Sequence, residues 1–169
     1  MAGTIACRRA PRLPQPSGLI DLTDSRAPGD PKWAADAGAF VVSFPSELLA
    51  EARRSWPKEL AANAAVGVLA LVGTCPKERA SLTYCVGDQR YRCPTCTSEY
   101  SRIGEYISGP FDRGLDQLRV QLSDDRDLLI DRNKRSRGPA ASARIEPVAA
   151  PLGAPRCAAV TPPVISDNG

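Results

Sequence analysis

Residues Ser81–Tyr100 read SLTYCVGDQRYRCPTCTSEY and combine strand-like alternation, a turn and closely spaced cysteines. Gly87-Asp88 suits a two-residue hairpin turn, which would pair Cys85 with Arg90 and Tyr84 with Tyr91. The second strand leads into the CPTC segment at residues 93–96. This cysteine spacing lets two thiolates bind one zinc ion or form one redox pair. The stretch therefore predicts a β-hairpin that presents a cysteine knuckle.

Four cysteines near this hairpin are candidate ligands of a Zn²⁺ ion: Cys75, Cys85, Cys93 and Cys96. Side chains alternate between the two faces of a strand, so the predicted register places Cys85 and Cys93 on opposite faces. Without a bulge these two thiols cannot bind one ion. A site made by the other three cysteines would take a carboxylate such as Glu99, or a group from a partner, as its fourth ligand. The alternative is that the cysteines are free, buried thiols.

A second interpretation treats Cys93 and Cys96 as a redox pair. Thr97 or Ser98 could cap a helix over SEYSRIGEYI, and the positive end of that helix would lower the pKa of Cys93. The four residues of CPTC also resemble the CPxC motif of glutaredoxins, a resemblance that implies thiol-disulfide exchange.

Composition excludes many catalytic mechanisms. The chain of 169 residues contains no histidine, which removes Ser-His-Asp triads, Cys-His pairs and histidine-bearing metal sites together. It also has no glycine-rich phosphate loop of standard spacing and no GxSxG turn between a strand and a helix. We therefore expect a protein that acts by binding and is not an enzyme.

The length allows one domain of ordinary size. Proline-rich segments at both ends predict a disordered arm at residues 1–32 and a basic, then Pro/Ala-rich, disordered tail at 132–169. The compact domain is predicted at residues 33–131. The first residues lack the continuous apolar segment of a secretory signal, so the expected location is cytoplasmic or nuclear.

Within that domain, Ser46 can cap a helix over SELLAEARRSW, and Pro57 suits the start of a second helix that continues to Val72. The second helix is apolar on nearly every face and must be buried, but it is too short to span a bilayer, which needs about 20 residues. Leucines at helical spacing predict a last helix over residues 112–131. The predicted fold class is α+β, with a small helical core, one β-hairpin and the cysteine knuckle.

Arginine predominates among the basic residues and suits bidentate contacts with phosphate. The candidate nucleic-acid contacts are Arg90, Arg92, Arg132, Lys134, Arg135 and Arg137. Aromatic residues beside arginine favour single-stranded or structured RNA as the partner. The alternatives are a solvated helix end for residues 132–137 and GC-rich coding for the arginine content.

Residues 44–60, FPSELLAEARRSWPKEL, resemble the opening of an F-box. The resemblance implies docking to the linker subunit of a cullin ubiquitin ligase through Pro45, Leu48 and Leu49. Silencing suppressors of poleroviruses carry a reduced F-box of this kind, and those of sobemoviruses carry CxxC knuckles. These resemblances imply a viral accessory protein that binds RNA or a host regulatory protein and suppresses RNA silencing, or else an adaptor for ubiquitin ligation.

Overall fold

The apolar run Val68–Val72 forms β3, a strand whose five residues are all buried at the centre of the first sheet. The computed structural model describes residues 30–123, 127–147 and 159–160. The first sheet has the order β1-β2-β3-β8-β9, and each pair of neighbouring strands is antiparallel. Its other strands are β1 (Lys32–Ala34), β2 (Ala39–Ser43), β8 (Gln117–Leu122) and β9 (Leu128–Ser136).

Two short helices connect β2 to β3. They are α1 (Leu49–Ser55), which follows the 3₁₀ turn η3 (Ser46–Leu48), and α2 (Lys58–Val66). Pro57 separates them, as the sequence predicts, but α2 ends before the predicted Val72. Gly67 adopts a left-handed conformation with φ 85° and ends the helix, and the β-branched Val68 and Val72 in the segment that follows favour a strand.

The second sheet has the order β10-β4-β5-β6-β7, again with antiparallel neighbours. Its strands are short: β4 (Thr83–Cys85), β5 (Arg90–Arg92), β6 (Glu99–Tyr100), β7 (Tyr106–Ser108) and β10 (Ala159–Val160). The predicted hairpin register is confirmed, because Tyr84 pairs with Tyr91 and Cys85 with Arg90. The turn between the strands covers residues 86–89 and is longer than the predicted two-residue turn at Gly87-Asp88; its left-handed residue is Gln89, at φ 53°.

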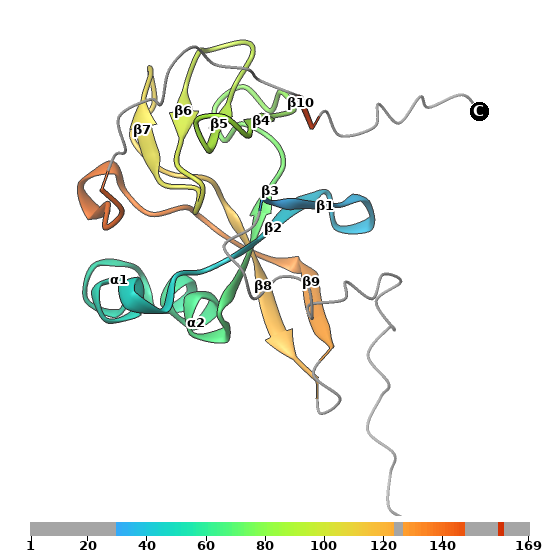
Figure 1. Cartoon of the computed structure of the whole chain (residues 1–169), viewed down its shortest axis with the longest axis vertical. Helices are drawn as coiled ribbons and strands as arrows, with labels where there is room; N and C mark the ends of the chain where they lie inside the picture. Colours follow the sequence, from blue (N-terminus) through green and yellow to red (C-terminus); the bar gives the residue numbers. More distant parts are fainter. Residues whose placement is uncertain (1–29, 124–126, 148–158, 161–169) are drawn as a thin grey trace, which may run out of the picture.

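One hydrophobic core joins the helices and both sheets. Phe40 of β2 lies at its centre, with its ring centroid 5.1 Å from that of Tyr91 in the second sheet. Trp56 and Leu60 contribute from the helical side. Figure 1 shows β4–β7 at one end of the molecule and α1, α2 and the β8–β9 hairpin at the other. Cys75 and Cys93 belong to this core, and Cys96 packs against it.

The mixed α and β class is confirmed, but strands predominate over helices, and the structure has two sheets where one hairpin was predicted. The predicted helix over 112–131 is wrong, because Gln117–Leu122 forms β8 and β9 begins at Leu128. Leu118 and Val120 are buried while Arg119 is exposed, which is the alternation of a strand. The leucines at helical spacing in the same segment suggested a helix instead. The predicted helix after Cys96 is also wrong, since residues 99–100 form β6.

The regular structure continues past residue 131, the predicted end of the domain, through β9 to the 3₁₀ turn η4 (Ala141–Ala143). A further 3₁₀ turn, η2 (Ala35–Ala37), joins β1 to β2. Most of the predicted N-terminal arm, residues 1–29, lies outside the described residues, as do residues 148–158 and 161–169 of the predicted tail. Among the described helices, none is long and apolar enough to cross a membrane.

Asp116, just before β8, holds the start of that strand to the end of β9. Its carboxylate accepts hydrogen bonds from Arg113, from Arg135 at 2.8 Å and from the backbone N–H of Gly138 at 3.0 Å. Burial alone would raise the pKa of this carboxyl group. The hydrogen bonds with the two arginines and Gly138 outweigh burial and hold the pKa below its ordinary value.

We therefore expect Asp116→Asn to reduce the free energy of unfolding at neutral pH by about 1–3 kcal/mol. The native pKa is lowered, so the contribution of Asp116 is present above the ordinary value of 3.8 and is lost as pH falls through the native pKa. Chemical denaturation of wild type and variant across acidic pH measures this difference, with Asp112→Asn as an exposed control. An Asp116→Asn variant as stable as wild type at neutral pH would contradict the assigned role.

Candidate metal centre

The first cysteine loop (residues 74–81) follows β3. The backbone N–H of Cys75 donates to the carbonyl of Ala80 at 2.8 Å, and the N–H of Arg79 donates to the carbonyl of Cys75 at 2.9 Å. Arg79 adopts a left-handed conformation with φ 57°, which lets the chain turn back toward Cys75. A bridge between Thr74 and Ser81 closes the loop. The thiol of Cys75 is thereby fixed at the edge of the core.

The second cysteine loop (residues 92–99) joins β5 to β6. The N–H of Cys93 donates to the carbonyl of Ser98 at 2.9 Å, and the N–H of Thr97 donates to the carbonyl of Cys93 at 3.1 Å. Thr97 is left-handed, with φ 58°. Cys96 stands inside this loop, so the predicted knuckle sits on a closed turn between two strands.

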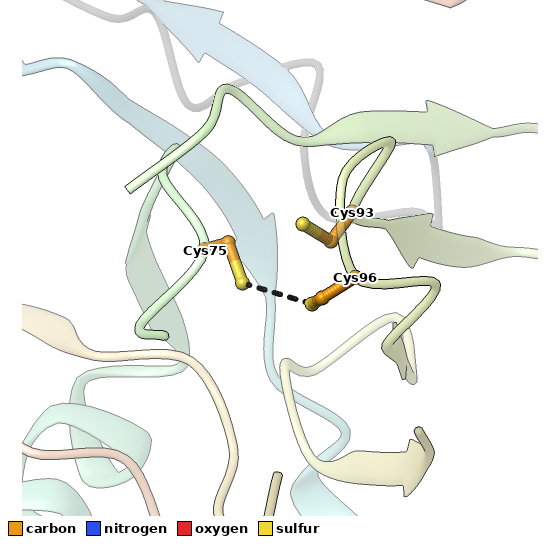
Figure 2. Close-up of side chains that lie close together, drawn as sticks. All are labelled: Cys75, Cys93 and Cys96. Atoms are coloured by element: carbon orange, nitrogen blue, oxygen red, sulfur yellow. Dashed lines mark hydrogen bonds between the residues drawn. The ribbon is translucent and has the colours of Figure 1, made fainter. Parts of the chain in front are cut away.

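The thiols of Cys75, Cys93 and Cys96 meet between the two loops (Figure 2). Their three sulfur atoms all lie within 4.8 Å of one another, and the Sγ atoms of Cys75 and Cys96 are 3.7 Å apart. Sulfurs bound to one tetrahedral zinc ion at about 2.3 Å stand about 3.8 Å apart. The spacing therefore fits one metal ion held by three thiolates. Among the described residues, no other group of three or more Cys, Asp or Glu side chains has a comparable arrangement.

Two hydroxyl groups border the sulfur cluster. Ser98 Oγ is 3.1 Å from Cys96 Sγ, and the Tyr100 hydroxyl is 3.7 Å from Cys75 Sγ. Burial, followed by the contact with Cys75, raises the pKa of Tyr100 far above its usual range, so the phenol stays protonated. Both hydroxyls can therefore donate to thiolates, as partners of metal ligands commonly do.

These two hydroxyl groups were missed by the sequence analysis. Ser98 and Tyr100 lie at alternate positions around the start of β6 and are both buried. Their closeness to the sulfurs depends on how the second loop closes, which no residue pattern indicates.

The three thiols differ in acidity and exposure. Burial raises the pKa of Cys93 to about 11. Burial also acts to raise the pKa of Cys96, but hydrogen bonds with Ser98, and then with Cys93 and Cys75, together outweigh it and leave the pKa below the ordinary value. Cys96 is also partly exposed, whereas Cys75 and Cys93 are 1% and 2% exposed. The redox interpretation expects the acidic thiol at Cys93, and the structure places it at Cys96.

The other two candidate ligands do not join the cluster. Cys85 is disulfide-bonded, so it has no thiol to offer a metal ion. Cys85 pairs with Arg90, which is the register from which its separation from Cys93 was predicted. Glu99 forms ion pairs with Arg90 at 2.9 Å and with Arg92 at 3.0 Å, across the β5–β6 ladder.

The basic candidates fall into two groups. Arg90 and Arg92 belong to the ion pairs of the second sheet, where Arg92 also contacts Asp88 at 2.5 Å. The remaining four are exposed along the edge strand β9 and just beyond it: Arg132, Lys134, Arg135 and Arg137. Of these, Arg135 forms the ion pair with Asp116, and Arg132 donates to the carbonyl of Asp36 at 2.7 Å. RNA binding at any of these residues stays a prediction.

The F-box-like residues lie where β2 leads into α1. Pro45, Leu48 and Leu49 are each partly buried, and the two leucines pack against the protein's own core. Docking of a ligase subunit through them stays a prediction, and it would use side chains that already have intramolecular contacts.

No family model matches this chain, and no curated protein matches it at a significant level. The geometry of the thiol cluster is therefore the observation that bears on function.

In the reduced, metal-free protein we expect iodoacetamide to alkylate Cys96 near neutral pH well before Cys93, because the thiolate is the nucleophile. Peptide mapping by mass spectrometry after short reaction times measures the order. Ser98→Ala should raise the pKa of Cys96 and slow its alkylation, since a hydrogen bond to the thiolate is lost. Faster labelling of the buried Cys93 would show that this ranking of the thiols is wrong.

Proposed function

We propose that this protein is a non-enzymatic binding module whose fold is held by one Zn²⁺ ion at Cys75, Cys93 and Cys96. The convergence of these three sulfurs carries the proposal. The ion would connect the loop that leaves the first sheet to a loop inside the second sheet. The metal would thus act as a cross-link between the two halves of the core.

Zinc is favoured by the type and spacing of the donor atoms. Soft thiolate ligands select zinc, Cu(I) or iron–sulfur clusters over magnesium and calcium, which prefer oxygen ligands. The 3.7 Å separation of Cys75 Sγ and Cys96 Sγ matches two ligands of one tetrahedral ion.

A structural role is favoured by the surroundings of the site. Cys75 and Cys93 belong to the core cluster that also contains Tyr91 and Tyr100. Metal binding there would add its free energy directly to folding, as it does in other small zinc domains. A chain without histidine also lacks the histidine ligands of the common catalytic zinc sites, which supports binding over catalysis.

We expect the protein, purified under reducing conditions, to contain one equivalent of zinc. Cys96→Ser should lower that content to near zero, because two thiolates retain zinc far less tightly than three. Elemental analysis gives the stoichiometry, and thermal unfolding with and without a chelator gives the stability that the metal supplies.

The matched control is Thr95→Ser, an exposed change in the same loop that removes no candidate ligand. It should retain the zinc and the chelator-sensitive unfolding of the wild type. A wild type that binds no metal after reduction and reconstitution, or a Cys96→Ser variant with unchanged metal content, would overturn the proposed site.

A further inference from the structure

The two cysteine loops share one backbone conformation. In each loop the N–H of the leading cysteine, Cys75 or Cys93, donates to the carbonyl of the fifth residue after it, at 2.8 and 2.9 Å. In each loop the carbonyl of that cysteine accepts from the N–H of the fourth residue after it, at 2.9 and 3.1 Å. The same two hydrogen bonds therefore close both turns.

Two further features match. The fourth residue after the cysteine is left-handed in both loops, with φ 57° at Arg79 and φ 58° at Thr97. Antiparallel pairs close both loops at the same positions, Thr74 with Ser81 and Arg92 with Glu99. The first loop is thus a structural copy of the second, in which the leading cysteine is again followed by proline.

The second loop supplies two sulfurs to the cluster, Cys93 from its first position and Cys96 from the third residue after it. The first loop supplies Cys75 from its first position. Its residue equivalent to Cys96 is Glu78, in the sequence Cys75-Pro76-Lys77-Glu78. A carboxylate oxygen is an established zinc ligand, and tetrahedral zinc needs a fourth donor beside the three thiolates.

We propose that Glu78 is the fourth ligand of the ion bound by Cys75, Cys93 and Cys96, an inference that rests on the proposed metal site. Each loop would then contribute two ligands from equivalent positions. The site would have three sulfurs and one oxygen, in place of the four sulfurs of a site made by two CxxC knuckles. Glu99, the carboxylate that the sequence suggests for this role, stands at the closing pair of the second loop and is held by Arg90 and Arg92.

The Glu78 side chain can turn toward the metal at little cost. Its carboxylate lies outside the sulfur cluster in this structure, and its described ion pair is with the neighbouring Lys77, at 3.5 Å. Both side chains of that pair are about a third or more exposed, at 40% and 34%, and exposed ion pairs contribute little to stability. Lys77 and Arg79, in the same loop, would offset the negative charge of an ion with four anionic ligands.

Cobalt(II) is the probe that tests this assignment, because its absorption spectrum reports both coordination geometry and thiolate ligation. The reduced, metal-free full chain is titrated with Co²⁺ as wild type, Glu78→Gln, Glu78→Cys and the control Glu59→Gln, which changes an exposed glutamate on α2. Competition with a chelator of known affinity gives the dissociation constant of each protein.

We expect wild type and Glu59→Gln to give the same tetrahedral thiolate spectrum and the same affinity. Glu78→Gln should bind Co²⁺ at least about tenfold more weakly, with altered ligand-field bands. Glu78→Cys should bind more tightly than wild type and strengthen the sulfur-to-cobalt charge-transfer absorption, since a fourth thiolate then joins the ion.

The possible failures are distinct. A thiolate–cobalt spectrum in wild type that is unchanged in affinity and shape in both Glu78 variants would overturn the role of Glu78 and leave the three-cysteine site intact. Absence of any thiolate–cobalt spectrum in wild type would overturn the metal site itself.

Discussion

The backbone hydrogen bonds that Cys75 and Cys93 make within their own loops are the constraint on which the candidate site depends. Each bond turns the chain back on itself, so that a thiol at the start of the turn faces the interior of the molecule. Because one loop leaves the first sheet and the other lies within the second, the turned-in thiols meet where the sheets join. The thiol cluster and the contact between the sheets are thus one structural feature.

The second sheet needs such a connection, because its described strands are only two or three residues long. Strands this short are marginal without other support, and small folds often add metal ions or disulfides to a limited core. Here the rings of Tyr84 and Tyr91 pack together at 4.9 Å and bury the face of the sheet. The disulfide of Cys85 adds a covalent connection to the same sheet, and a metal ion in the thiol cluster would add a second one.

The sequence predicted the local features whose causes are local. Gly87-Asp88 and the alternating residues around it specified the hairpin register, and the alternation of faces separated Cys85 from Cys93. Prediction from the sequence failed where one residue pattern is compatible with both a helix and a strand. The run ending at Val72 reads as a buried helix or a buried strand, and only the cap at Gly67 divides it. Residues 112–131 carry leucines at helical spacing, which predicts a helix. The alternation of buried Leu118, exposed Arg119 and buried Val120 instead fits the strand that residues 117–122 form.

The candidate site could likewise be predicted only where its cause is local. The closely spaced cysteines indicated three of its groups, but the equivalence of Glu78 and Cys96 depends on matching hydrogen bonds and left-handed residues in two loops. In the sequence that equivalence appears only as a repeated Cys-Pro pair. Glu99 is closer to Cys96 along the chain, and it was therefore the carboxylate that the sequence suggested.

X-ray absorption at the zinc edge of the reconstituted full chain tests the central claim most directly. The account predicts three sulfur neighbours at about 2.3 Å and one oxygen neighbour at about 2.0–2.2 Å around a single zinc ion. A spectrum with only oxygen or nitrogen neighbours would contradict it, because it would place the ion away from Cys75, Cys93 and Cys96.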